Sequence, residues 1–304
     1  MDSIRAIELL TASSATGLLF ALTGTGGSSI LTPIMTLLLG FSPTIAIPSD
    51  IVGSISMRAT TSLLNIRLGR VAKGILTPLV VGQLCGLGIS AAFLSGIHLS
   101  DAALNVILGF TLSLIGSALA LKEFVNRTSE KEYRFTVTHL LLFIGGTVSA
   151  LTVAFTSVGG GIVTYLVVAI AFPKLDPKSV IAVDATAGLI LSILASIETI
   201  ATGRGDVVVM ALIAAGGLIG CVGGERIKEK ISSHILKEAI AITISAIGII
   251  YLVRSGALIP AIILGGGYLI VLTVQRKTIH RKRSGKDASD GVTIVSKSRH
   301  SDIR

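Results

Sequence analysis

Long apolar stretches, separated by short polar ones, follow one another along almost the whole chain. The pattern predicts eleven helical segments, roughly at 4–22, 27–40, 49–66, 74–96, 102–121, 135–155, 159–172, 181–201, 207–223, 235–253 and 257–274. Most are continuous rather than alternating and approach the ~20 residues that an α-helix needs to cross a bilayer, which excludes a transmembrane β-barrel. We therefore predict an all-α, polytopic integral membrane protein.

Two of these segments are too short to cross a membrane. Segments 27–40 and 159–172 would each span roughly 21 Å as a helix, against about 30 Å of hydrocarbon. Each contains or follows a cluster of glycines within apolar sequence, at residues 24–29 and 157–161. We expect either half-helices or one arm of a re-entrant hairpin.

The two glycine clusters belong to an internal repeat. Five further matches share one common spacing: Pro43 and Pro177, Asp50 and Asp184, Gly69-Arg70 and Gly203-Arg204, Gly82 and Gly216, Gly86 and Gly220. The spacing of the glycine clusters is shorter by a single position. With about five segments in each copy, an odd number, the copies enter the membrane in opposite senses and form an inverted repeat. We expect membrane repeats at 1–134 and 135–256, an extra transmembrane helix at 257–275, and a basic, disordered cytoplasmic tail at 276–304.

Composition and charge add an orientation. Hydrophobic residues make up 51% of the chain and charged residues 14%, with a mean hydropathy of +0.84. The net charge of +9 does not indicate nucleic acid, because the basic residues lie in short loops and in the tail. By the positive-inside rule the N-terminus lies outside and the C-terminus in the cytoplasm, in the cell membrane, with the lipid bilayer as partner. The outside loops then hold only Arg5, Arg204 and Arg254; the inside loops hold Arg67, Arg70, Lys73, Lys122, Arg127, Lys131, Arg134, Lys174, Lys178, Arg226, Lys228, Lys230 and Lys237.

The glycine clusters are the predicted substrate-binding site. A helix that begins in mid-membrane leaves N–H groups unpaired and carries a partial positive charge at its start. A small oxyanion satisfies both, and glycine lets the backbone approach it. The alternative is that the small residues serve close helix packing. With Arg58, the candidate binding residues are Gly24, Thr25, Gly26, Gly27, Ser28, Ser29, Ser157, Val158, Gly159, Gly160 and Gly161.

Arg58 is the most informative single charge. It lies in the middle of a predicted segment, two helical turns after Asp50, so the two share roughly one face. An arginine at this depth is costly and faces protein or water. It either attracts the anion into the pathway or forms a structural pair with a carboxylate such as Glu198 or Asp184. Its counterpart in the second copy is Ser192, so the duplication does not require the charge.

Three carboxylates are candidates for coupling or for structure. Asp50 and Asp184 each open a predicted segment, where an aspartate accepts backbone N–H bonds as a helix cap. Capping is the favoured interpretation, with proton coupling as the second. Glu198 lies near the end of its segment and is expected at the interface, although it could also pair with Arg58 or accept a proton.

Catalysis is not expected. No Gly-x-Ser-x-Gly or His-x-x-x-His motif occurs, and the histidines lie in loops, at segment ends or in the tail: His98, His139, His234, His280 and His300. No phosphate-binding Gly-x-x-x-x-Gly-Lys-Ser/Thr motif occurs either, which argues against direct drive by ATP. We therefore predict no enzyme, no cofactor and no metal site.

The glycine motifs resemble those of a known family. The first copy reads Gly24-Thr25-Gly26-Gly27, then an apolar run and the loop Phe41-Ser42-Pro43; the second reads Val158-Gly159-Gly160-Gly161. Over roughly residues 10–253 the chain is similar to the sulfite exporter TauE/SafE family. The resemblance implies a membrane permease for sulfur-containing anions such as sulfite, sulfoacetate or another organosulfonate. The extra C-terminal span and the basic tail depart from the family's usual pattern.

These expectations combine into one hypothesis. We predict a secondary transporter for a small sulfur-containing anion that works by alternating access of two inverted repeats. The alternative is a transporter or a channel for another small anion, a carboxylate or an inorganic ion. Coupling to protons or to sodium, and assembly into a homodimer, are left open. Nucleic acid is not an expected partner.

Overall fold

The computed structural model describes residues 2–23, 28–96, 99–125, 135–158, 160–172, 174–227 and 246–254. No strand occurs among these residues, and the all-α prediction is confirmed. The helices are α1 (Ser3–Thr23), α2 (Ser28–Pro33), the π-helix η1 (Ile34–Leu38), α3 (Pro43–Gly53), α4 (Ile55–Arg67), α5 (Lys73–Gly96), α6 (Asp101–Val125), α7 (Phe135–Thr156), α8 (Gly160–Ala171), α9 (Pro177–Ala201) and α10 (Val207–Ile227). Residues 246–254 are also helical. The predicted span 257–275 and the tail 276–304 lie outside the described residues.

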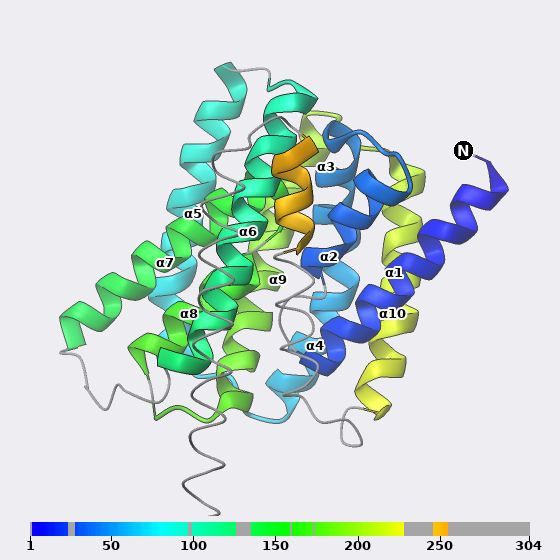
Figure 1. The fold of residues 1–304 in the computed structure, drawn as a ribbon. Coiled ribbons are helices and arrows are strands. Elements are labelled where there is room, and N and C mark those ends of the chain that lie inside the picture. The colour runs from blue at the N-terminus through cyan, green and yellow to red at the C-terminus, as the bar shows by residue number, and fades with distance from the viewer. Residues whose placement is uncertain are drawn as a thin grey trace, which may run out of the picture.

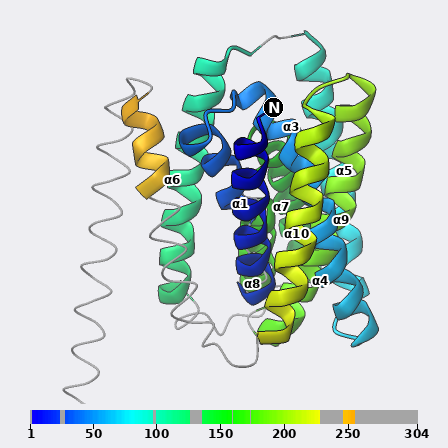
Figure 2. The same ribbon diagram turned by 90° about the vertical axis from the view of Figure 1, so that its right-hand side faces the viewer.

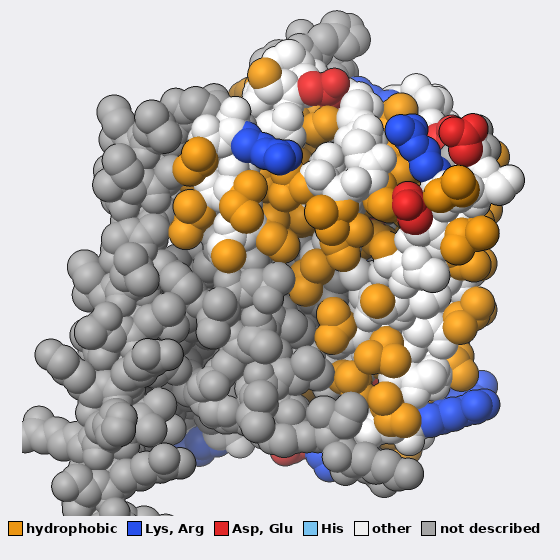
Figure 3. Space-filling view, turned by 45° about the vertical axis from the view of Figure 1, so that its right-hand side comes forward, with side chains coloured by type: hydrophobic (Ala, Val, Ile, Leu, Met, Phe, Trp, Pro, Cys, Tyr) orange, Lys and Arg blue, Asp and Glu red, His pale blue; other side chains and the backbone are white. Residues whose placement is uncertain are grey.

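Five of these helices are long and apolar enough to cross a membrane. They are Ser3–Thr23, Lys73–Phe93, Val137–Thr156, Lys178–Ala201 and Val207–Ile227. Large apolar side chains such as Leu140 and Ile219 stand exposed on their outer faces. Figure 3 shows hydrophobic side chains spread over the surface between charged side chains at its two ends. Such a surface is stable in lipid and not in water.

Two predicted segments begin earlier than their apolar pattern suggested. The segment expected from residue 49 starts at Pro43 and is interrupted at Ser54, between α3 and α4. The segment expected from residue 181 starts at Pro177. Proline is favoured in the first helical turn because its missing N–H has no partner there to lose. In both copies, therefore, proline starts the helix well before the aspartate.

The short helices return along their predecessors. The Ser149 hydroxyl on α7 donates to the Gly160 carbonyl of α8 (3.0 Å) and accepts from the Thr164 hydroxyl (3.2 Å). Residues 11 and 15 positions apart can meet in this way only if α8 doubles back on α7. In Figure 1 the corresponding pair α1 and α2 occupies the other half of the molecule. This geometry favours hairpin arms over isolated half-helices.

Two helix pairs form the main packing interfaces, α1 with α10 and α5 with α7 (Figures 1 and 2). Both depend on glycine, because a methyl group at these positions would overlap a neighbouring backbone. A Cβ on Gly220 would lie 1.8 Å from the Ser14 carbonyl oxygen, and one on Gly86 would lie 2.5 Å from that of Thr147. Membrane helices approach closely where such small residues face each other.

The same two interfaces are related by the repeat. A Cβ on Gly82 would meet the Phe143 carbonyl oxygen at 2.1 Å, and one on Gly216 would meet that of Leu10 at 2.6 Å. Gly82 and Gly216 are mates in the sequence repeat, and Leu10 and Phe143 share the spacing of the two glycine clusters. Each half therefore contributes its first helix, α1 or α7, to one interface and a later helix, α5 or α10, to the other.

Candidate functional site

A buried carboxylate joins the two halves of the molecule. Asp50 on α3 is fully buried, and its Oδ2 accepts hydrogen bonds from the Thr32 hydroxyl (2.6 Å) and the Ser157 hydroxyl (2.9 Å). Thr32 belongs to α2 in the first half, whereas Ser157 belongs to the glycine break of the second. The other oxygen, Oδ1, has no hydrogen-bond partner among the described residues. One oxygen of Asp50 thus receives both donors.

The favoured capping role is wrong for both aspartates. Asp50 is the eighth residue of α3, whose N-cap is Ser42, and Asp184 is the eighth residue of α9, whose N-cap is Asp176. Both side chains are buried inside the bundle, 0% and 1% exposed. The apolar pattern placed the helix starts at the aspartates because the polar loops end there, but the prolines two turns earlier already begin the helices.

Asp184 has a different environment from Asp50. It lies against Gly161 in the first turn of α8, where an added Cβ would be 3.2 Å from its Oδ2. The amino end of a helix carries a partial positive charge, which stabilises an ionised carboxylate. The second glycine cluster therefore brings a helix start to an internal carboxylate.

Arg58 lies on α4 between these two carboxylates and is 5% exposed. It interacts electrostatically with Asp184 and Asp50. Of the two carboxylates expected to pair with it, Asp184 is therefore the one within range. Its guanidinium stands 5.8 Å from the centroid of the Phe20 ring on α1, and an added Cβ on Gly188 would lie 2.3 Å from its Nη1. A bulkier residue at 188 would displace the charge.

The structure describes most residues of the second glycine cluster, 157–161. Ser157 adopts a left-handed backbone with φ 58°, and Val158 is fully buried. Gly160 packs closely, since an added Cβ would lie 2.3 Å from Cγ2 of Val153. Gly160 thus fits the packing alternative, whereas Ser157 and Gly161 contact the carboxylates. Of the remaining candidates, Gly24, Thr25, Gly26, Gly27 and Gly159 lie outside the described residues, as do the side chains of Ser28 and Ser29.

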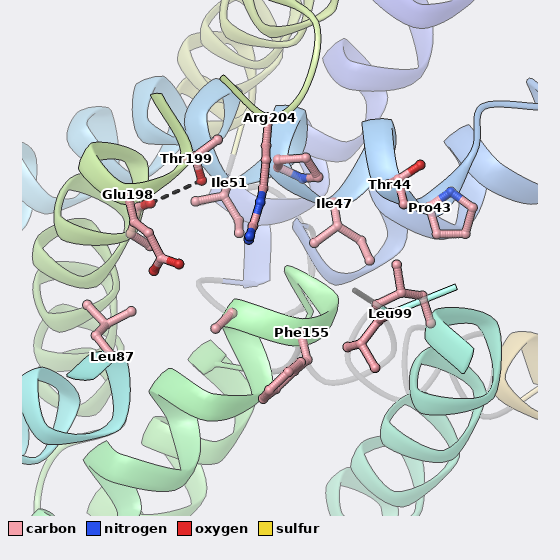
Figure 4. Close-up of a pocket in the computed structure, with 14 residues that line it drawn as sticks. Pro43, Thr44, Ile47, Ile51, Leu87, Leu99, Phe155, Glu198, Thr199 and Arg204 are labelled. Atoms are coloured by element: carbon pink, nitrogen blue, oxygen red, sulfur yellow. Dashed lines mark hydrogen bonds between the residues drawn. The ribbon is translucent and has the colours of Figure 1, made fainter. Parts of the chain in front are cut away.

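A cavity of about 210 Å³ lies beside the cluster, close to the loop between α9 and α10 (Figure 4). Its wall is mostly apolar and includes Ile51, one residue from Asp50 on α3. Glu198, half-buried near the end of α9, and Arg204 supply its charged groups. Glu198 is therefore part of a cavity wall rather than a simple surface residue. The lining comprises Pro43, Thr44, Ile47, Pro48, Ile51, Leu87, Leu99, Leu104, Ala154, Phe155, Ala195, Glu198, Thr199 and Arg204.

Sequence reasoning missed several residues of the cluster. Thr32, Phe20 and Gly188 carry no motif of their own, and each reaches the site only through helix packing. Arg204 was predicted as an outside charge and as the repeat mate of Arg70, but not as a site residue. Thr32 directly follows the first apolar residues of the glycine motif, and this position was the one sequence signal that could have marked it as a site residue.

Comparison with known proteins identifies the family of this chain. The family model for the sulfite exporter TauE/SafE matches residues 9–251. This chain belongs to the TauE/SafE family. The match covers both glycine breaks, both aspartates and Arg58, and it confirms the resemblance noted in the sequence. A TauE/SafE-type chain is a membrane permease, which classes this protein with transporters.

One curated relative supports the same class. The chain is 26% identical over 246 residues to the probable membrane transporter protein YjnA of Bacillus subtilis (strain 168), which covers 77% of this chain and 94% of the relative. No solved structure matches the chain.

Proposed function

We propose that this TauE/SafE protein is a secondary transporter of a small sulfur-containing anion, with Arg58 as the charge that attracts it. The observation that carries the proposal is the buried guanidinium between the two halves. It contacts Phe20 on α1 and Gly188 on α9, and it interacts with carboxylates of both halves. A cation so deep in a membrane protein marks a ligand or ion pathway.

Two further features support anion transport. The first turn of α8, which carries a partial positive charge as a helix start, lies beside Asp184 of the cluster. An oxyanion is a ligand that such a helix start binds without a fixed lysine. The hydroxyls of Thr32 and Ser157, which now donate to Asp50, are also suited to donate to substrate oxygens.

Alternating access of an inverted repeat is the proposed mechanism. Its support is the matched packing of α1 on α10 and α5 on α7, with glycine contacts at the repeat's own spacing. In Figure 1, α1 runs down from the N-terminus while α7 runs up. Rocking one half against the other about Asp50 and Ser157 would open the cluster to either side in turn.

The proposed orientation places the N-terminus outside the cell membrane. Successive helices run in opposite directions. One side of the molecule therefore holds the helix ends and loops that carry Arg67, Lys73, Lys174, Lys178 and Arg226, and the loop with Arg204 lies on the other side. The positive-inside rule assigns the more basic side to the cytoplasm. A cysteine-accessibility assay on intact cells, with a cysteine placed at Ser3 or at Lys73, tests this orientation.

The decisive experiment combines binding with flux. Purified protein in detergent is titrated with thiosulfate, sulfite, sulfoacetate and sulfate, with acetate as a control, while its melting temperature is followed. At least one sulfur anion should stabilise the wild type, and Arg58→Gln should weaken that binding by tenfold or more. Arg67→Gln, an exposed arginine of the same helix α4, is the matched control and should bind as the wild type does.

Two results would contradict the proposal. If acetate stabilised the protein and no sulfur anion did, the substrate would be a carboxylate rather than a sulfur-containing anion, which is the alternative class. Unchanged anion binding in Arg58→Gln would show that Arg58 is not part of the binding site. In proteoliposomes, a carrier exchanges labelled anion faster when the same anion is present on the far side, whereas a channel does not. Absence of such stimulation would favour the channel alternative.

A further inference from the structure

Three ionisable side chains of the buried cluster do not balance. Asp50, Asp184 and Arg58 would together carry one net negative charge if all were ionised. Taking an uncompensated charge out of water is costly, and the cost rises in a membrane. One bound proton makes the cluster neutral. The structure also shows which carboxylate is better suited to hold it.

We propose that Asp50 binds a proton that is carried together with the anion, an inference that rests on the proposed transport function. Its Oδ2 already accepts both hydroxyl bonds, from Thr32 and Ser157, and can accept them in either protonation state of the acid. Its Oδ1 is buried and has no partner among the described residues, so it is the open position for the proton.

Asp184 is less suited to this role. Its carboxylate lies against Gly161 at the positively polarised start of α8, and the stronger electrostatic interaction of Arg58 is with Asp184. Both contacts favour the ionised carboxylate. Asp50, by contrast, accepts hydrogen bonds only from neutral hydroxyl groups, and its electrostatic interaction with Arg58 is the weaker of the two.

Other ionisable groups on the helices packed against α3 lie elsewhere. The described parts of α2 and η1 carry none, and α7 carries only His139, near the end opposite Ser157. Cys221 on α10 contacts Thr61 and Met57 instead. The other charged side chains described on these helices and on the loop after α9 lie near helix ends or in the cavity wall: Arg67, Asp101, Lys178, Glu198, Arg204, Asp206, Glu225 and Arg226. The side chains of Lys122 and Glu123 on α6 lie outside the described residues. Arg58 is therefore the described charge that acts on Asp50, and Asp184 competes for the same guanidinium.

The proton and the anion favour each other's binding. With Asp50 protonated, Arg58 and Asp184 leave the cluster neutral and an entering anion meets no net negative charge. With Asp50 ionised, the cluster repels the anion. Anion binding is therefore strongest at low pH and weakens as the pH rises through the titration of Asp50. A monovalent anion and its proton would cross in the same direction as a neutral pair, whereas a divalent anion such as thiosulfate and one proton would carry one net negative charge.

The test uses the full-length protein in proteoliposomes with a pH-sensitive dye inside. The probes are thiosulfate and sulfoacetate, whose sulfur-centred acids stay ionised between about pH 5.5 and 8, so any pH dependence in that range belongs to the protein. Wild type should move protons inward with the anion. Asp50→Asn should keep anion-for-anion exchange, lose proton movement and bind the anion independently of pH. Glu8→Gln, an exposed carboxylate on α1, should retain proton coupling.

The outcomes separate clearly. The proposal would be overturned if Asp50→Asn moved as many protons per anion as the wild type does. It would also be overturned if proton movement were lost in Asp184→Asn but not in Asp50→Asn. If the wild-type anion flux followed a sodium gradient and not a proton gradient, sodium would be the coupling ion. Loss of exchange in an Asp50→Asn protein of normal melting temperature would make Asp50 a binding or structural residue. No anion binding or flux by the wild type would refute the proposed function instead.

A second variant serves if Asp50→Asn does not fold. Thr32→Val keeps the carboxyl group and removes one donor that stabilises its ionised form. The midpoint of the pH dependence of anion binding should then move to higher pH. An unmoved midpoint would overturn the assignment of the proton to Asp50.

Discussion

The two halves of this permease agree in their packing and differ in their charges. Gly220 on α10 meets the backbone of Ser14 as Gly86 on α5 meets that of Thr147. At the centre, however, Arg58 has the small buried Ser192 as its counterpart. The comparison teaches that the glycine packing follows the sequence repeat, whereas the buried arginine belongs to the first half alone.

The paired aspartates show the same difference at closer range. Asp50 takes hydrogen bonds from two hydroxyls, one of them from the opposite half, while Asp184 lies at the start of α8. In the proposed mechanism, the single arginine and the two unequal carboxylates form one site, which a carrier would present to each side in turn.

The largest effect is expected from breaking the symmetric packing. Gly220→Ala and Gly86→Ala each force a methyl group onto a neighbouring carbonyl, at 1.8 Å and 2.5 Å. Backbone cannot rotate away, so each change should cost about 1–3 kcal/mol or more, with Gly220→Ala the worse. Melting temperature in detergent measures the loss.

Each of these variants has a control on its own helix. An added Cβ on Gly223 of α10 or on Gly88 of α5 would meet nothing within 4 Å. Alanine there should leave the melting temperature unchanged or raise it slightly, because alanine favours helix more than glycine does. Equal losses at test and control positions would show that helix contact at these glycines does not hold the halves together.

A smaller effect is expected where the halves differ in charge. Gly188→Ala places a methyl group 2.3 Å from Nη1 of Arg58, the end of a flexible side chain that can shift. Anion affinity should fall about tenfold, which corresponds to roughly 1.4 kcal/mol, with little change in melting temperature. Ser192→Ala on the same helix removes a hydroxyl at the counterpart of Arg58 and should bind the anion normally. Weaker binding in both variants would mean that the Ser192 hydroxyl also contributes to anion binding.

The smallest effect is the difference expected between two variants at the second break. Ser157→Ala and Ser157→Gly both remove the hydroxyl that donates to Asp50, so the loss of this hydrogen bond is common to them. Only glycine relieves the left-handed backbone at φ 58°, by about 1 kcal/mol. Ser157→Gly should therefore melt above Ser157→Ala. The reverse order would show that the backbone at this break is not under strain.

Much of the fold could be predicted from the sequence because a membrane imposes simple rules. Apolar length marked the helices that the structure describes, and the family resemblance was confirmed. Helix starts were less certain: α3 and α9 begin at Pro43 and Pro177, because proline fixes a helical backbone before the apolar run begins. The break within that segment at Ser54 left no signal in the apolar pattern.

By itself, the sequence determined that this chain is helical, lies in a membrane, repeats its glycines at a nearly constant spacing and carries one arginine within an apolar segment. Those features depend on local composition and on order along the chain. Only the tertiary structure decided that Asp50 accepts bonds from Thr32 and Ser157, and that Arg58 stands against Phe20 and Gly188. These contacts join residues from different helices, and close packing at the glycines sets their distances.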